Sequence, residues 1–383
     1  MKATRLLIVA GLLLAASAHA DLTDLVAEEV LKQIAEETSG EAAKRNLDTI
    51  TLQHRMRAST QFDNATAHVL AMLARYGLDE VGTLEYPADG ETMFGTQKSR
   101  RVWDVRSAEL WELDEVDGEA VRVRRLADWS SVPLSLAQDS LSGDVTTTVV
   151  DVGTGRSDAD YAGKDVRGKL VLTSSQPGAV ANRAVRERGA AGIISYAPNQ
   201  RSAWWLADDR LVRWGHLDSF PEFETFGFMI SLGEARKLQQ RLAAGEEIVL
   251  HAKVDASHRD GQYRFATAAI RGTDKADEDI HFTCHLDHPR PGANDNASGC
   301  VSILEVARTL NALVKADILP RPLRTIRFLW PAEIEGSIIY LSQHDDVSRI
   351  KANIHMDLSL IHISEPTRQL THSRMPSYAG KMG

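Results

Sequence analysis

The chain has 383 residues, of which 43% are hydrophobic and 25% are charged, which excludes a disordered or low-complexity protein. Its length favours two or three domains over one. The formal net charge of −9 argues against nucleic acid or an anionic membrane as a partner, and it becomes −11 if Lys2 and Arg5 are removed with a leader.

The first segment, residues 1–20, is typical of a secretory signal peptide. Two basic residues precede the apolar run Leu6 to Ala16, and Ala18-His19-Ala20 fits an A-x-A cleavage site. The run is short for a membrane span, which needs about 20 residues, and no other run is long enough. We expect an exported protein, periplasmic or secreted, that starts near Asp21 and has no membrane span after cleavage. The alternative is an N-terminal membrane anchor.

Residues 21–119 are expected to form the first part of the main domain. Thr23 to Glu37 and Ala65 to Tyr76 carry apolar residues at helical spacing, and Gly77 would end the second helix. The stretch from Pro87 to Leu113 is irregular or β-rich in pattern.

Residues 120–255 are expected to form an inserted, β-rich α/β domain. A capping box at Ser231 to Glu234 predicts a helix that continues to Ala244. The other predicted elements are strands at Thr147–Val152, Lys169–Thr173 and Gly192–Tyr196 and a helix at Ala179–Gly189. The phrases Val166 to Leu172 and Arg188 to Ile194 look like those of a protease-associated domain. That resemblance implies a lid or a substrate-recruiting module.

An aromatic and basic cluster lies within this insert. Ordinary packing or a solvated loop is its simpler interpretation, and contact with a peptide is the alternative. Its members are Trp204, Trp205, Arg210, Arg213, Trp214 and His216.

Residues 256–357 hold the strongest pattern in the chain. His285-Leu286-Asp287 follows a predicted strand at Asp279–Thr283, and a Pro/Gly-rich turn leads to Asp295 at the start of a predicted helix. The strand at Arg324–Trp330 precedes Glu333 and Glu335, and the strand at Ala352–Met356 precedes Asp357. Alternating strands and helices indicate a mostly parallel mixed sheet with helices on both faces. Ligands gather beyond the carboxyl ends of such strands, and imidazole and carboxylate groups suit zinc.

This order of residues resembles the co-catalytic two-zinc aminopeptidases of peptidase family M28. Together with the leader, the resemblance implies an exported, zinc-dependent exopeptidase, namely an aminopeptidase, that hydrolyses peptide bonds with a water activated by two zinc ions. By that resemblance Asp295 bridges two zinc ions, and His285 and Asp357 bind one of them. Asp287 would orient His285. Glu333 would be the general base and Glu335 a ligand of the other zinc, although Ile334 between them leaves the order of these two roles open.

Several alternatives stay open on the sequence alone. The same site could serve a carboxypeptidase or a glutaminyl cyclase, and a non-enzymatic, receptor-like binding ectodomain is a further possibility. The sequence does not give the side-chain preference or the oligomeric state. Cys284 ends a predicted strand and Cys300 lies on the apolar face of a predicted helix, so we expect two buried thiols rather than a bridge or zinc ligands.

The segment 358–383 is expected to be non-native. Leu358 to Arg368 resembles a sequencing adapter translated in frame, and no further strand–helix unit follows. In the family that this chain resembles, the last zinc ligand is a histidine that lies well beyond the position of Asp357. We therefore expect this chain to be a truncated, impaired copy that lacks that ligand. The alternative is a genuine short terminus in which His362 or His372 serves.

Overall fold

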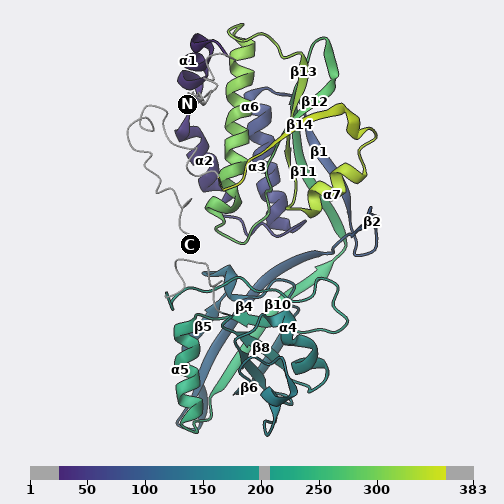
Figure 1. Cartoon of the computed structure of the whole chain (residues 1–383). Helices are drawn as coiled ribbons and strands as arrows, with labels where there is room; N and C mark the ends of the chain where they lie inside the picture. Colours follow the sequence, from purple (N-terminus) through teal and green to yellow (C-terminus); the bar gives the residue numbers. More distant parts are fainter. Residues whose placement is uncertain (1–25, 198–207, 359–383) are drawn as a thin grey trace, which may run out of the picture.

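The computed structural model describes residues 26–197 and 208–358. The predicted signal peptide, Trp204 and Trp205, and all but the first residue of the predicted non-native tail lie outside the described residues. The described chain forms two bodies, each built on its own sheet, one above the other in Figure 1.

The first body, which holds the candidate ligands, contains a five-stranded mixed sheet with the order β1-β11-β13-β12-β14. These strands are β1 (Asp79–Ala88), β11 (Gly261–Ile270), β13 (Arg324–Trp330), β12 (Lys275–Thr283) and β14 (Ile350–His355). β12 pairs in parallel with β13 and β14, whereas β11 pairs antiparallel with β1 and β13. The parallel half of this sheet therefore contains the strands that precede the candidate ligands, and their carboxyl ends lie at one edge.

Helices cover both faces of this sheet (Figure 1). Phe282 of β12 packs in the core with α6, while its neighbour His281 contacts Tyr340 of α7, because adjacent side chains on a strand point to opposite faces. Four helices gather on the α6 side, and α7 (Glu335–Ser342) lies on the other. The four are α1 (Glu28–Glu37), α2 (Gly40–Ile50), α3 (Thr60–Tyr76) and α6 (Gly299–Lys315).

The segment Ala293–Lys315 is the one helix among residues 26–197 and 208–358 that is long and apolar enough to cross a membrane. Of its most apolar window, 67% is buried within the protein. The indole nitrogen of Trp330 donates to the carbonyl of Cys300 in this helix at 3.1 Å. Packing in the core thus accounts for the apolar character of α6.

Cys284 and Cys300 are joined by a disulfide, so the expectation of two separate buried thiols was wrong. The end of β12 lies directly against the first turn of α6, which brings the two Cα atoms to 5.2 Å, within the range that a disulfide spans. Sequence periodicity placed each cysteine in the core but could not say that they face each other.

The second body contains a seven-stranded sheet with the order β5-β4-β10-β6-β7-β8-β9. Its strands are β4 (Val102–Val116), β5 (Glu119–Asp128), β6 (Gly143–Asp151), β7 (Leu170–Thr173), β8 (Gly192–Ser195), β9 (Gly227–Met229) and β10 (Val249–Arg259). The predicted helix beginning at Ser231 is α5 (Leu232–Ala243), and the Ser231 side chain accepts from the backbone N–H of Glu234 at 3.2 Å. The predicted helix near Ala179 is a short α4 (Pro177–Ala181) followed by a π-helical turn, η4 (Asn182–Arg186).

Short elements complete the fold. They are β2 (Met93–Phe94), β3 (Gln97–Lys98), the 3-10 turns η2 (Pro133–Ser135), η3 (Asp158–Tyr161) and η6 (Val347–Arg349), and the π-helical turn η5 (Ala293–Ser298).

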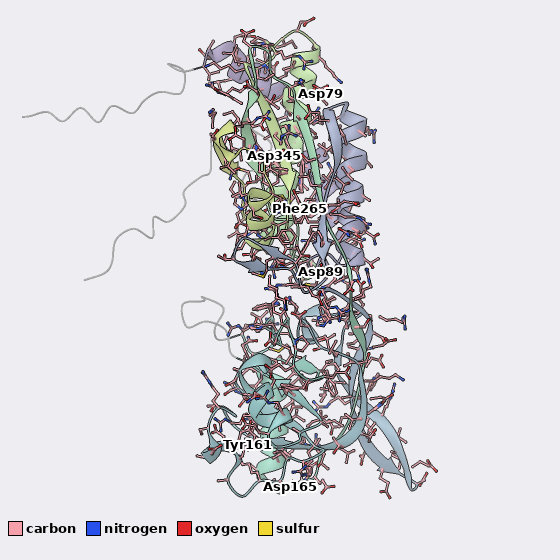
Figure 2. All side chains as sticks on the ribbon, turned by 90° about the vertical axis from the view of Figure 1, so that its right-hand side faces the viewer. Asp79, Asp89, Tyr161, Asp165, Phe265 and Asp345 are labelled. Carbon is pink, nitrogen blue, oxygen red and sulfur yellow. A yellow bond between two sulfur atoms is a disulfide. The ribbon has the colours of Figure 1, made fainter. Side chains whose placement is uncertain are left out.

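The two bodies meet where β4 and β10 reach the first body. The insert was expected to begin near residue 120, but β4 already belongs to the seven-stranded sheet. Val102 and Arg259 lie opposite each other in the β4–β10 pair, and Asp260 alone separates β10 from β11. Figure 2 shows Phe265 in the first body, Tyr161 in the second and Asp89 near the junction.

Candidate metal centre

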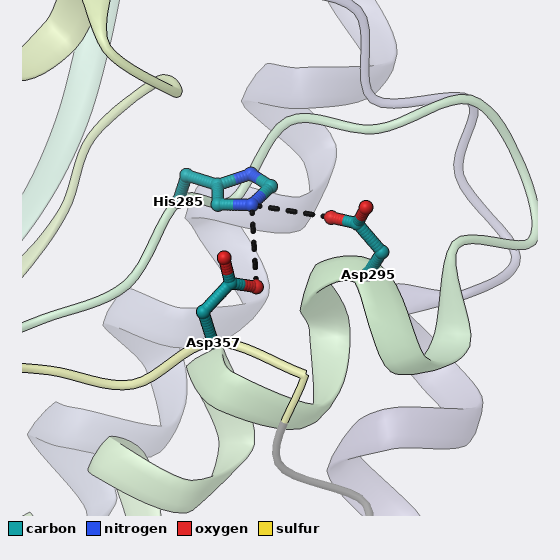
Figure 3. A group of neighbouring side chains, drawn as sticks. All are labelled: His285, Asp295 and Asp357. Carbon is teal, nitrogen blue, oxygen red and sulfur yellow. Dashed lines mark ion pairs between the residues drawn. The ribbon is translucent and has the colours of Figure 1, made fainter. Parts of the chain in front are cut away.

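Three candidate ligands converge at the carboxyl edge of the five-stranded sheet (Figure 3). His285 follows β12, Asp295 lies in η5 before α6, and Asp357 follows β14. His285 Nε2 lies 3.2 Å from Asp295 Oδ1 and 3.6 Å from Asp357 Oδ1. All three ligand atoms fall within 4.8 Å of one another. One imidazole nitrogen and two carboxylate oxygens at these separations fit a single zinc ion, which takes such ligands at about 2.0–2.2 Å.

Asp287 orients the His285 ring. His285 Nδ1 lies 3.1 Å from the Asp287 carbonyl oxygen and 3.6 Å from its carboxylate Oδ1. If Nδ1–H donates to these oxygens, Nε2 is left with a lone pair directed at Asp295 and Asp357. A metal-binding histidine is held by its second nitrogen in this way, so the predicted role of Asp287 is consistent with the geometry.

The charges of His285 and the neighbouring carboxylates are strongly coupled. Burial alone would lower the pKa of His285, but hydrogen bonds with the carboxylates of Asp287 and Asp295 outweigh it and raise that pKa to about 10. Burial would raise the pKa of Asp287, yet His285 and the charge of Arg57 keep it below its usual value. The carboxylates therefore favour the positively charged form of the His285 ring.

The second carboxylate oxygen of Asp295 faces a different direction. Its Oδ2 lies 3.6 Å from Nε2 of His288, whose Nδ1 lies 2.8 Å from the carbonyl of Pro289. Both Asp295 and Asp357 are about half exposed, at 49% and 45%. Asp295 therefore offers one oxygen to the His285 side and one to the His288 side.

Glu333 lies beside this group and is open to solvent. Its backbone N–H donates to Asp287 Oδ1 at 2.6 Å, which fixes the main chain. Its carboxylate is 49% exposed and lies 3.4 Å from Nη2 of Arg57. Glu333 also lines two cavities, of about 800 Å³ and 670 Å³, one reaching Asp295 and the other reaching His285 and Asp357.

Residues 266–374, which contain this whole group, match the sequence model of Peptidase family M28. This part of the chain is an M28 peptidase domain. The match includes residues 358–374 of the tail, whose non-native origin stays a prediction. A search among curated proteins found no match.

Solved structures share the fold of this chain. A peptidase M28 precursor from Shewanella amazonensis has 20% identity and a TM-score of 0.55, over 83% of this chain and 70% of that one. BSAP, a zinc aminopeptidase from Bacillus subtilis, has 18% identity and a TM-score of 0.54, over 82% and 69%. A putative peptidase from Clostridium acetobutylicum has 17% identity and a TM-score of 0.54, over 86% and 59%.

Glu335 does not join the three candidate ligands of the M28 domain. Its buried carboxylate accepts a short hydrogen bond from the Tyr263 hydroxyl and lies 2.9 Å from Arg100 Nε. Burial raises the pKa of Glu335 despite these partners. Ile334, at a φ of +52°, turns the chain between the two glutamates, so that Glu333 faces the cavities and Glu335 starts α7 beneath them.

Two arginines of the first body near this group were not predicted from the sequence. Arg55 is fully buried and donates to the carbonyls of Leu286, Pro291 and Gly292 at 2.7–3.2 Å, so it braces the loop between His285 and Asp295. Arg57 Nε lies 3.0 Å from Asp287 Oδ2 and 3.8 Å from Glu335. Both residues lie more than 200 positions before His285 in the sequence. The one feature that could have pointed to them is the occurrence of two arginines in the polar segment between α2 and α3.

Proposed function

We propose that the protein is a zinc-dependent exopeptidase that acts as an aminopeptidase. The observation that supports this most strongly is the convergence of His285, Asp295 and Asp357 at the carboxyl edge of an M28 domain. The similarity in fold to BSAP, which is described as a zinc aminopeptidase, agrees with this choice. The substrate would be a peptide.

The residues of the chain supply positioning and proton transfer. Zinc bound at this group would lower the pKa of a coordinated water and polarise the peptide carbonyl. Glu333 is exposed at the junction of the two cavities, where its carboxylate can take a proton from a water molecule and pass it to the leaving amine. Asp287 and Arg57 hold the His285 ring and the Glu333 carboxylate in place.

We further propose that two zinc ions are bound, with Asp295 as the bridge. The support is that its two oxygens face different partners, His285 and His288. The Asp295→Ala variant should lose more zinc than any other single carboxylate variant, because a bridge serves both ions. Zinc per chain, measured by mass spectrometry after dialysis, tests this. An Asp357→Ala variant that loses as much zinc as Asp295→Ala would contradict the bridge.

The activity is tested on the purified protein with zinc and aminoacyl anilides. The expected result is release of the chromogenic amine that stops with a chelator and returns with zinc, at a low rate because this chain is expected to be an impaired copy. Hydrolysis of N-blocked peptides from the carboxyl end would favour a carboxypeptidase, and cyclisation of an N-terminal glutamine would favour a glutaminyl cyclase. Zinc binding without turnover of any of these compounds would favour the non-enzymatic binding ectodomain.

We also propose export of the protein, on the strength of the sequence of residues 1–20. Expressed in a bacterial host with its own leader, the soluble product should begin at Asp21. N-terminal sequencing decides this, and a soluble product that retains Met1 would rule it out.

A further inference from the structure

A cavity of about 800 Å³ lies between the M28 domain and the insert. Asp295, His288 and Glu333 line it on the M28 side, and Trp214, Leu217 and Phe220 line it on the insert side. It is of the size that binding sites for drug-sized ligands have. The cavity therefore joins the candidate reacting groups to a wall supplied by a different part of the chain.

The insert wall presents aromatic surface to water. Trp214 and Phe220, at 42% and 38% exposure, are the only exposed aromatic side chains of Phe, Tyr or Trp within residues 26–197 and 208–358. The Trp214 ring packs against the His216 ring at a tilt of 33°, with ring centroids 4.9 Å apart, and its carbonyl accepts from the Gln176 side chain at 3.1 Å. One exposed aromatic residue is ordinary, but two on the wall of one cavity indicate a surface that an apolar group covers.

The charges that line this cavity disfavour an acidic ligand. The two arginines on its wall, Arg57 and Arg100, are both paired with protein carboxylates. Arg100 also donates to the hydroxyl of Ser219 at 2.5 Å. Four further carboxylates line the cavity, so a ligand with a carboxylate would meet mainly like charge. They are Asp139, Asp218, Asp295 and Glu333.

We propose that this cavity binds the part of the peptide that follows the scissile bond, and that Trp214 and Phe220 form a subsite for a large apolar side chain. The assignment rests on the proposed function, because it takes Asp295 and Glu333 as the reacting end of the cavity. The leaving peptide is the part of an aminopeptidase substrate that has enough length to extend from these groups to the insert.

The test is calorimetric titration of the full chain, carrying Glu333→Gln to stop turnover, with zinc present. The probes are Ala-Phe amide, Ala-Ala amide and Ala-Glu amide. Ala-Phe amide should bind about tenfold or more tightly than Ala-Ala amide, since burial of a phenyl group is worth at least that factor. Ala-Glu amide should bind more weakly than Ala-Ala amide.

Variants of the cavity wall identify the residues that cause the preference for Ala-Phe amide over Ala-Ala amide. Trp214→Ala or Phe220→Ala should reduce the ratio of Ala-Phe to Ala-Ala affinity to below about threefold, and Trp214→Phe should keep most of it. Leu211→Ala is the matched control, because Leu211 lies in the insert with the same 42% exposure but does not line this cavity. Thermal unfolding of each variant shows whether it is folded.

The outcomes separate this assignment from the proposed function. Zinc-dependent anilide hydrolysis without any preference for Ala-Phe amide, or a preference that survives in both alanine variants, would overturn the subsite alone. A preference that is lost in the alanine variants, with no hydrolysis by the parent protein, would leave the subsite standing and overturn the aminopeptidase.

Discussion

The Nε atom of Arg57 lies 3.0 Å from Oδ2 of Asp287, and both side chains are largely buried. Asp287 in turn contacts His285, so Arg57 fixes the orientation of a candidate zinc ligand without contacting the metal group itself. Its Nη2 reaches Glu333 at 3.4 Å. One guanidinium therefore connects the ligand side of the site with the proposed base.

Replacing Arg57 with methionine should leave the buried Asp287 carboxylate without its cation. Loss of one partner of a buried pair costs roughly 3 kcal/mol in unfolding free energy. Arg57→Lys should recover part of that loss because it keeps the charge but not the planar fork. Chemical denaturation measures both variants, and an Arg57→Met protein within about 0.5 kcal/mol of the parent would contradict this role.

Glu333→Gln should keep its zinc and lose turnover by about 100-fold or more, as removal of a general base does. Glu335→Gln should lose at most one zinc ion per chain and keep the one at His285, since Glu335 lies apart from that group. Zinc content and anilide hydrolysis of the two variants are compared side by side. If Glu333→Gln loses zinc while Glu335→Gln retains all of it, the roles of the two glutamates are reversed.

His54 should make the fold sensitive to acid. Burial, with the charges of Arg290 and Arg55, lowers its pKa from 6.5 to about 3. The unfolded chain therefore binds a proton below pH 6.5 that the folded chain does not. The stability contributed by neutral His54 is present above pH 6.5 and is lost as pH falls towards 3. This one group should cost about 2 kcal/mol between pH 7 and pH 5.

The His54→Gln variant checks this prediction. Its unfolding free energy, measured in denaturant at pH 7 and pH 5, should fall by about 2 kcal/mol less than that of the parent. His344→Gln is the control, because His344 is only partly buried. If the unfolding free energies of the parent and the His54→Gln variant fall equally between pH 7 and pH 5, His54 is not the source of the acid sensitivity.

The disulfide between Cys284 and Cys300 should stabilise the M28 domain. It closes a loop with a sequence separation of 16 that includes His285 and Asp295. A loop of that length corresponds to about 3 kcal/mol in unfolding free energy. The Cys284→Ala/Cys300→Ala variant should unfold at correspondingly lower denaturant. Alkylation of the parent in denaturant without a reductant should label no cysteine, and labelling of two would show that the bridge is absent.

The sequence predicted the elements in which one physical pattern dominates. The strand at Arg324–Trp330 has the predicted bounds, because its apolar residues lie between Pro322 and Pro331, which interrupt regular structure on both sides. The helix α2 was missed, although Ser39 caps it, because its apolar positions are few and it follows α1 after a short link. The clustering of His285, Asp295 and Asp357 followed from the rule that ligands lie beyond parallel strands.

Contacts between distant segments were beyond the reach of the sequence. Glu335 is two residues from Glu333, and nothing in the spacing shows that Tyr263 and Arg100 surround it. The same holds for Arg55, three of whose carbonyl partners lie more than 200 residues further along the chain. The pairing of Cys284 with Cys300 likewise depends on how β12 meets α6.

The chain enters and leaves the insert at a single point, where Val102 and Arg259 are opposite partners. Such adjacent ends allow a whole unit to be gained or lost without disturbing the host. A short turn between residues 101 and 260 could replace the entire insert while β1 and β11 keep their pairing. Exchange of this module in one recombination event would therefore leave the five-stranded sheet and the three candidate ligands in place.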